Sequence, residues 1–269
     1  MTTTRIDPHV PTENRLIYAL DGMTLAESIA QVRRLRDVVK IYKVGPALIY
    51  EDGLRVANQI VKAGNGGNVQ VFLDMKTWDI PETVLNAIDT IEKFGGDAVV
   101  FATVHTFNVN LRKLIDAKKH RKFKIFAITL LTSQDEGDLK DLGISLSVED
   151  YVLYMAKRAQ EFGCDGVICS GLEAKRLKQE LGKQFRVITP AVRPSWAIVA
   201  GDDQKRIVTP RQAILNGADY IVVGRPIRMA PDPVQAAQSI RNEIEKTLAE
   251  MRSAAEPDHP GRTRMLAAG

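Results

Sequence analysis

Short apolar runs recur along the 269-residue chain, and an amphipathic stretch follows most of them. The runs are rich in Val, Ile, Leu and Phe, which is typical of buried parallel strands. Stretches such as "TLAESIAQVRRLRDVV" and "PETVLNAIDTIEKFGG" instead repeat apolar residues at intervals of three and four, as amphipathic helices do. We expect strands at residues 16–20, 39–44, 69–73, 98–101, 124–130, 166–169, 186–188 and 220–223.

A weak internal repeat indicates that one strand-helix unit is used several times. "GGDAVVF", "GCDGVIC" and "GADYIVV" each place Gly and Asp before an apolar strand. This arrangement is typical of a helix C-cap and a tight turn that lead into a buried strand. Eight alternations of strand and helix favour an α/β fold, a single-domain (β/α)8 TIM barrel, over an open doubly wound sheet. The first strand ends in "LDGMT", without a glycine-rich dinucleotide fingerprint, which argues further against the open sheet.

Composition limits the class of protein. The hydrophobic fraction of 45% and the charged fraction of 26% are those of an ordinary globular protein. Apolar runs stay well short of the roughly 20 residues that a membrane helix needs, and the polar N-terminus does not resemble a secretion signal. The net charge of +4 comes without a dense basic block, so we expect neither nucleic-acid nor membrane binding.

The cysteines and the chain ends complete the expected organisation. Cys164 and Cys169 match neither a disulfide framework nor a zinc pattern, so we expect reduced, buried thiols and a cytoplasmic location. The barrel domain should span residues 14–251. Polar or small-residue tails, poorly ordered, should occupy residues 1–13 and 252–269.

Charged residues follow three consecutive predicted strands. Asp21 follows the first, Lys43 lies near the end of the second, and Asp74 follows the third with Lys76 two residues later. Because side chains alternate along an extended chain, Asp74 and Lys76 should point to the same side, toward the barrel mouth where such barrels do their chemistry. Asp79 comes from the loop beyond. Unrelated surface ion pairs are the alternative for any one residue, but the alternating set favours a catalytic cluster.

The last strands predict an anion site. "YIVVGRPI" places Gly224 and Arg225 after the eighth strand, where barrels often bind phosphate, and an arginine can grip an anion with two parallel hydrogen bonds. The segment "ITPAVRPSWAIVAGDDQKRIVTP" is too long for an ordinary connection. We therefore expect a functional lid, with Arg193 and Gln204 polar enough to close over an anionic ligand.

The segment "DMKTWDIPETV" resembles the Asp-x-Lys-x-x-Asp-Ile-Pro-x-Thr signature of the orotidine 5′-phosphate decarboxylase family. "YALD", "YKVG", "LLTS", "TPAVRP", "GDDQKRIVTP" and "GADYIVVGRPI" extend the resemblance, in the family's order, over residues 16–240. The resemblance implies decarboxylation of orotidine 5′-phosphate to UMP and CO₂, the last step of de novo UMP synthesis. It also implies a homodimer that uses no metal and no other cofactor.

The resemblance also implies a role for individual residues. Lys76 matches the proton donor of the family, and Lys43 and Asp74 match its partners in an alternating charge network. Asp79 matches the fourth member, which in this family reaches across the dimer interface into the neighbouring site. The other implied substrate contacts are Asp21 to the ribose, Thr83 in the signature segment, Thr132 and Ser133 at the pyrimidine edge, and Gln204, Gly224 and Arg225 at the phosphate with Arg193 nearby.

The reaction itself requires such residues. Loss of CO₂ from C6 of the pyrimidine leaves an electron pair in the ring plane, where the π system cannot delocalise it. A fixed ammonium in a water-poor pocket can stabilise this pair and then protonate the carbon. Lys76 can do both, while Asp74 and Asp79 keep the lysines charged and oriented despite burial.

Some residues depart from the family pattern, and three alternatives remain. Thr77, Trp78 and Ala191 stand where members commonly have other residues, a glycine in the last case, and "GDDQ" carries one extra residue. Metal-dependent 3-keto-gulonate-phosphate decarboxylases and hexulose-phosphate synthases share Asp-x-Lys-x-x-Asp, but "IPET" and the lysine at position 43 argue against them. A catalytically silent phosphate-binding barrel would not need the charge network. A Schiff-base aldolase would need a neutral lysine, whereas aspartates flank Lys76.

Overall fold

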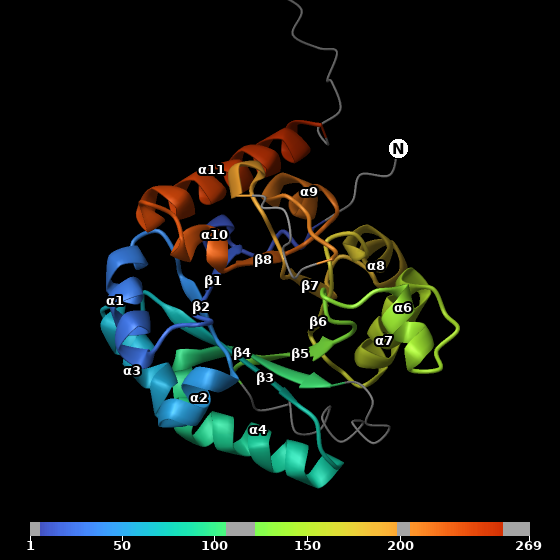
Figure 1. The fold of residues 1–269 in the computed structure, drawn as a ribbon, viewed down its shortest axis with the longest axis horizontal. Helices are drawn as coiled ribbons and strands as arrows, with labels where there is room; N and C mark the ends of the chain where they lie inside the picture. Colours follow the sequence, from blue (N-terminus) through green and yellow to red (C-terminus); the bar gives the residue numbers. More distant parts are fainter. Residues whose placement is uncertain (1–5, 106–121, 198–204, 255–269) are drawn as a thin grey trace, which may run out of the picture.

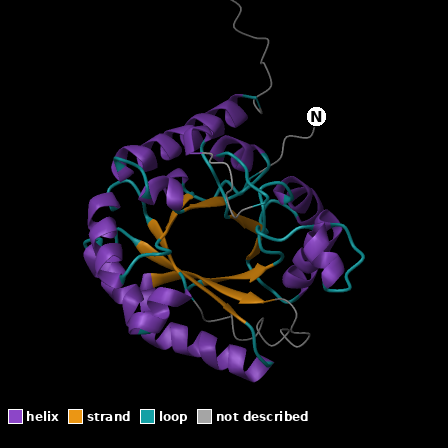
Figure 2. Ribbon diagram, viewed as in Figure 1, coloured by secondary structure: helices purple, strands orange, loops and turns teal. Residues whose placement is uncertain are grey.

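The computed structural model describes residues 6–105, 122–197 and 205–254. Within these residues, eight parallel strands close into a barrel in sequence order, and the helices surround it (Figure 1). Figure 2 shows the strands as an inner ring enclosed by helices. The predicted TIM barrel is therefore confirmed. The strands are β1 (Leu16–Ala19), β2 (Ile41–Val44), β3 (Gln70–Thr77), β4 (Val99–His105), β5 (Lys124–Ile128), β6 (Gly166–Ile168), β7 (Arg186–Thr189) and β8 (Tyr220–Val223).

The helices begin where the sequence supplies caps. The Thr24 side chain accepts a hydrogen bond from the Glu27 N–H, and the Glu27 carboxylate accepts one from the Thr24 N–H, so a capping box starts α1. Pro81 occupies the first turn of α4, as predicted. None of the helices in the described part of the chain is long and apolar enough to cross a membrane. The helices are η1 (Thr12–Asn14), α1 (Leu25–Leu35), α2 (Pro46–Asp52), α3 (Arg55–Ala63), α4 (Pro81–Gly95), η2 (Gly96–Ala98), α6 (Glu136–Asp141), α7 (Val148–Glu161), α8 (Ala174–Leu181), η3 (Ser195–Ala197), α9 (Pro210–Leu215), α10 (Arg225–Arg228) and α11 (Pro233–Ser253).

The core has two layers because strand side chains alternate between the barrel interior and the helices. The outer layer, between strands and helices, includes both free cysteines, which are buried as predicted. The inner layer fills the barrel with apolar side chains. Its centre is a group of aromatic rings in edge-to-face contact, with centroids 4.9 to 6.5 Å apart: Phe72, Phe101, Phe126 and Tyr220.

Two strands extend beyond the apolar runs that predicted them. β3 continues through Lys76 to Thr77, and β4 continues to His105 rather than ending at Phe101. Leu73 pairs with Ala102 and Thr77 with Val104, so four steps along β3 face two along β4. This irregularity is a β-bulge, and it lies where the sequence places Asp74 and Lys76. The charged residues predicted to follow the third strand are therefore part of it.

The repeated Gly-x-Asp motif fastens neighbouring strands at their amino ends. The Asp165 carboxylate accepts a hydrogen bond from the Ile125 N–H at 2.8 Å, and the Asp219 carboxylate accepts one from the Val187 N–H at 2.8 Å. In both cases the Asp N–H donates back to the carbonyl of the same partner. The third copy differs, because Asp97 forms an exposed ion pair with Lys122.

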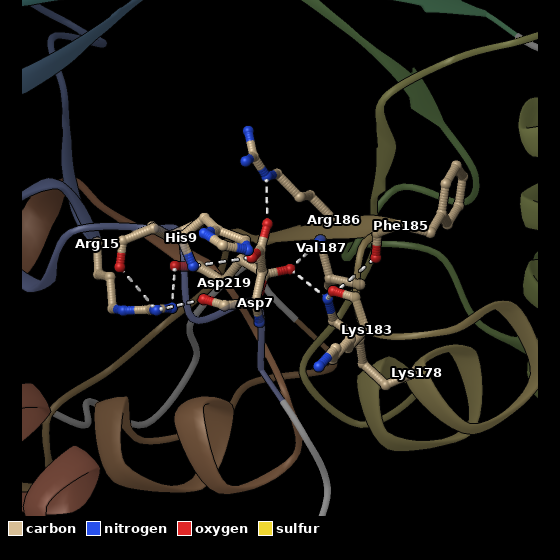
Figure 3. A network of polar contacts seen from close by, with 10 residues as sticks. Asp7, His9, Arg15, Lys178, Lys183, Phe185, Arg186, Val187 and Asp219 are labelled. Carbon is tan, nitrogen blue, oxygen red and sulfur yellow. Dashed lines mark hydrogen bonds and ion pairs between the residues drawn. The ribbon is translucent and has the colours of Figure 1, made fainter.

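Residues 6–13, which we expected to belong to a poorly ordered tail, pack against the base of the barrel. Val10 is 3% exposed and packs with the inner layer of the core. Asp7 is equally buried, and its N–H donates to the Asp219 carboxylate at 2.9 Å. The barrel fold therefore includes residues on the N-terminal side of residue 14. Figure 3 shows the surrounding cluster, here called the base network: Asp7, Arg15, Lys178, Arg186 and Asp219.

Candidate active site

A cavity of about 530 Å³ opens at the carboxyl ends of the strands. Its floor is apolar, since Phe72, Ile128 and Val222 of the inner core line it. A large concave site with a few converging polar groups is the usual form of a ligand pocket. The cavity brings together the following predicted site residues: Asp21, Lys43, Asp74, Lys76, Thr132, Ser133, Arg193, Gly224 and Arg225.

Four charged side chains form a chain of contacts at one side of this cavity, here called the mouth network: Asp21, Lys43, Asp74 and Lys76. Lys43 Nζ lies 2.8 Å from Asp21 Oδ2 and 3.2 Å from Asp74 Oδ2. Lys76 Nζ lies 2.9 Å from the same Asp74 oxygen. The Asp74 carboxylate thus joins two ammonium groups. Asp21 supplies a second carboxylate to Lys43.

Burial and pairing set the charge of the two central groups. Burial alone would raise the pKa of Asp74, but the ammonium groups of Lys43 and Lys76 outweigh it and lower that pKa below its usual value. Burial would likewise lower the pKa of Lys43, but Asp74 and Asp21 outweigh it and raise that pKa. Both groups are therefore charged around neutral pH although each residue is less than 10% exposed.

Two residues beside the mouth network were not predicted from the sequence. Thr103, on β4, accepts a hydrogen bond from the Lys76 N–H at 2.7 Å. Arg228 lines the cavity, and its Nη1 donates to the carbonyls of Asp21 and Gly22 at 2.7 and 2.8 Å. A threonine in an apolar strand looks like a core residue, so its pattern gave no signal. Arg228 could have been found, because it lies one helical turn after Arg225.

The predicted phosphate residues line the cavity from the segments that follow β7 and β8. Gly224 follows β8 and is the N-cap residue of the short helix α10, whose first residue is Arg225. Arg193 is 6% exposed and reaches the cavity from the segment after β7. The ends of this long segment are held together, since Val192 and Val208 form an isolated bridge. Gln204 lies outside the described residues.

The loop after β5 carries Thr132 and Ser133 and is tied to the segment after β7. The Thr132 carbonyl accepts hydrogen bonds from the Lys205 and Arg206 N–H groups at 3.2 and 3.3 Å. The Arg206 guanidinium also donates to three carbonyls of the same loop and pairs with Glu173 at 2.8 Å. These bonds fix the position of the predicted base-reading loop.

Asp79 and Thr83 do not reach the cavity of their own chain. Both are exposed at the start of α4, and Asp79 Oδ1 accepts a hydrogen bond from the Ile80 N–H at 2.7 Å. Three of the four predicted network members therefore meet within one chain. Among the residues that the structure describes, no three His, Cys, Asp or Glu side chains converge to form a metal site.

Known proteins match both the sequence and the fold. The family model described as "Orotidine 5'-phosphate decarboxylase / HUMPS family" matches residues 14–240. Orotidine 5'-phosphate decarboxylase of Afipia carboxidovorans is 42% identical over 91% of this chain and 98% of its own length, and that of Rhodopseudomonas palustris is 42% identical over 87% and 95%. The crystal structure of the Lactobacillus acidophilus enzyme has a TM-score of 0.70 and 33% identity over 86% of this chain and 99% of its own. The chain therefore belongs to the orotidine 5'-phosphate decarboxylase / HUMPS family.

Proposed function

We propose that this chain is a cytoplasmic enzyme that decarboxylates orotidine 5′-phosphate to UMP and CO₂, with Lys76 as the proton donor. The observation that carries the proposal is the Asp74 carboxylate shared by Lys43 and Lys76 above an apolar floor. Relatives named for this reaction support it, as does the family model. The two buried free thiols suit a reducing compartment.

The charge network supplies what the chemistry needs. When the bond from C6 to the carboxylate breaks, its electron pair stays on C6 and CO₂ leaves. The Lys76 ammonium stabilises the developing carbanion and then donates its proton to C6, which gives UMP and a neutral amine that solvent reprotonates. Asp74 holds both lysines oriented before the substrate arrives, so little reorganisation is needed during the reaction.

The cavity offers a site for each part of the substrate. Arg193 and Arg225, which line it, suit a phosphate, because their forked donors match phosphate oxygens. Binding energy from this remote group can be used to organise the reacting centre. The proposed contacts are Arg193, Gln204, Gly224 and Arg225 to the phosphate, Thr132 and Ser133 to the pyrimidine, and Asp21 with Lys43 to the ribose.

The electrostatics of the site distinguish this reaction from a metal-dependent one within the family. A metal-dependent enzyme would need a metal ligand at position 43. In this chain a divalent cation bound there would instead meet the positive charge of the Lys43 ammonium. Both lysines contact Asp74 Oδ2, and Lys76 Nζ lies 2.9 Å from it, so a cation bound to this oxygen would also be repelled by the second ammonium. The site therefore favours a reaction in which ammonium groups, rather than a metal, stabilise the anion.

The direct test is the loss of orotidine 5′-phosphate ultraviolet absorbance with purified enzyme, with and without a chelator. We expect turnover that the chelator does not change. The Lys76→Ala variant should lose at least about 1000-fold in kcat, because it lacks both the electrostatic and the acid contribution. Turnover that requires an added metal, or that persists at the wild-type rate in Lys76→Ala, would refute the proposal.

We also propose that two copies of the chain form a homodimer in which Asp79 and Thr83 serve the neighbouring site. Asp79 lies beside exposed apolar side chains at the end of β3, where Trp78 is 68% and Ile80 66% exposed. Large exposed apolar groups next to a polar motif are typical of an interaction surface. This supports an interface at the segment that carries Asp79.

Mixing two inactive variants tests the shared site. In a hybrid of Asp79→Ala and Lys76→Ala chains, one of the two sites combines an intact Lys76 with the partner's intact aspartate. After random exchange of subunits, about a quarter of wild-type activity should return, since half of the dimers are hybrids with one good site. Exchange shown by mass spectrometry without any recovery of activity would contradict a shared site.

A further inference from the structure

The main chain of Lys76 has an unusual conformation. Its φ is +50°, in the left-handed region that residues other than glycine seldom adopt. It lies within the β-bulge between Leu73 and Thr77, where the register against β4 shifts. A lysine on an ordinary strand would need no such conformation, so neighbouring groups must hold it in place.

A single hydroxyl group of the adjacent strand provides this hold. Thr103 Oγ1 accepts a hydrogen bond from the Lys76 N–H at 2.7 Å. The same oxygen donates its hydrogen to Asp74 Oδ1 at 3.3 Å, a longer and weaker bond. Thr103 is 2% exposed, so water has little access to replace either bond.

The two contacts of Thr103 act on the two residues that carry the proposed chemistry. Asp74 Oδ1 faces Thr103, while Asp74 Oδ2 faces the lysine ammonium groups. The hydroxyl therefore sets the plane of the carboxylate and the main-chain position of the proton donor together.

Thr247 is a buried threonine whose hydroxyl makes a commoner contact than that of Thr103. It donates to the carbonyl of Glu243, one turn earlier in α11.

We propose that Thr103 is a positioning residue that fixes Lys76 and Asp74 relative to the reacting carbon. The inference rests on the proposed role of Lys76 as proton donor. A hydroxyl that acts only through Lys76 and Asp74 should influence the chemical step and leave substrate binding by the phosphate residues after β7 and β8 unchanged. Loss of the hydroxyl should therefore lower kcat much more than it raises KM.

The test compares Thr103→Val, which keeps the shape and removes the hydroxyl, with Thr103→Ser, which keeps the hydroxyl. We expect Thr103→Val to lose about 10-fold to 100-fold in kcat, since small displacements of a reacting group have effects of this size. KM should change by less than about threefold, and Thr103→Ser should retain at least about a third of the wild-type kcat. Thr247→Val, which removes a buried hydroxyl far from the cavity, should leave both constants unchanged.

Three outcomes would overturn the proposal: wild-type kcat in Thr103→Val, an equal loss in Thr103→Ser, or a loss expressed mainly in KM. Should Thr103→Val fold poorly, Thr103→Ala must show the same loss of kcat. Amide hydrogen exchange gives a readout that does not depend on turnover, because the Lys76 N–H should exchange faster in Thr103→Val. If the wild-type enzyme fails to decarboxylate orotidine 5′-phosphate but the exchange difference between wild type and Thr103→Val is observed, the proposed function is wrong. The hydrogen bond from Lys76 to Thr103 would still be supported.

Discussion

Buried charges gather at both ends of this barrel, but the two clusters are built differently. In the base network, Arg15 donates to the main-chain carbonyls of Asp7, Val10 and Asp219 at 2.8 to 3.0 Å. Lys178 is bound in the same way to two carbonyls, besides its contact with Asp219. The base charges thus secure main-chain segments. The mouth lysines bind carboxylate side chains and face a cavity.

The difference shows how one fold separates stability from chemistry. The base network joins the N-terminal segment to β8, more than 200 residues away in sequence. The mouth, in contrast, contains strained backbone, since Lys76 and Ala191 both line the cavity with positive φ. Strain of this kind persists where function requires it and other contacts compensate. Substitutions at the base should therefore change mainly stability, and substitutions at the mouth should change mainly activity.

The largest effect should come from Asp74→Asn. An amide oxygen cannot hold two ammonium groups as a carboxylate does, so Lys43 and Lys76 lose their common anchor. We expect kcat to fall by about 1000-fold, the upper range for removal of one preorganised electrostatic group. The midpoint of urea unfolding should fall less than it does after substitution at the base, because Lys43 keeps Asp21 as a second carboxylate partner. A loss of stability as large as the one expected for Asp219→Asn would contradict the division between a stabilising base network and a catalytic mouth network.

The corresponding substitution at the base is Asp219→Asn. Asp219 is fully buried and accepts bonds from the Asp7 and Val187 N–H groups while it contacts Lys178. Removing one charge of a buried pair costs about 3 to 5 kcal/mol, measured here by urea unfolding. The kcat of the folded fraction should equal that of the wild type.

A matched control comes from the same sequence motif. Asp165 makes the equivalent main-chain bonds to Ile125 but is only partly buried. Asp165→Asn should cost about 1 to 2 kcal/mol, as expected for a hydrogen-bonded group with some access to water. Equal costs at Asp219 and Asp165 would show that full burial beside Lys178 does not increase the cost of losing the carboxylate.

Alkaline pH should affect the two lysine sites in opposite directions. Pairing raises the pKa of Lys43 above 10.5, so its contribution to stability is complete below that pH and is lost as pH rises through the raised value. Burial lowers the pKa of Lys178, although Asp219 opposes the shift. Between that lowered value and 10.5 the unfolded chain binds more protons than the native one, so the Lys178 contribution increases with pH.

Urea unfolding of Lys43→Met and Lys178→Met over about pH 8 to 11 measures this difference. The free energy of unfolding of the wild type relative to Lys178→Met should rise toward pH 10.5. Relative to Lys43→Met it should stay level and then fall above that pH. Slopes of the same sign would show that both lysines occupy similar electrostatic environments.

The sequence predicted the parts of the molecule that depend on local pattern. Period-two alternation placed Asp74 and Lys76 on one side of a strand, and the glycine and arginine after the eighth strand reached the cavity as expected. The same reasoning ended the third strand at residue 73, because charged residues usually indicate a loop. The bulge that keeps them within β3 depends on pairing with β4, which the local pattern does not contain.

Long-range pairing also explains what the sequence could not predict. Thr103 and His105 interrupt an apolar run, so the predicted fourth strand ended too early and the partner of the Lys76 N–H was missed. The N-terminal segment is polar in sequence, yet Asp7 is buried because its N–H group donates to the Asp219 carboxylate. This partner lies 212 residues away, so the local pattern does not reveal it. Polar residues are buried when a specific partner is present, and composition alone does not reveal that partner.

The smallest predicted effect concerns the strain at Ala191. This residue has a φ of +59° and is 7% exposed. An alanine in the left-handed conformation costs about 1 to 2 kcal/mol of stability, which a glycine would not cost. Glycine has more conformational freedom in the unfolded chain, and this opposes folding by about 0.5 to 1 kcal/mol. Ala191→Gly should therefore stabilise the protein by up to about 1 kcal/mol, measured by urea unfolding. Ala249→Gly, at an exposed position near the C-terminal end of α11, should instead destabilise it by up to about 1 kcal/mol. A loss of stability in both variants would mean that the mouth holds Ala191 without strain, and the contrast between a strained mouth and a relaxed base would then rest on Lys76 alone.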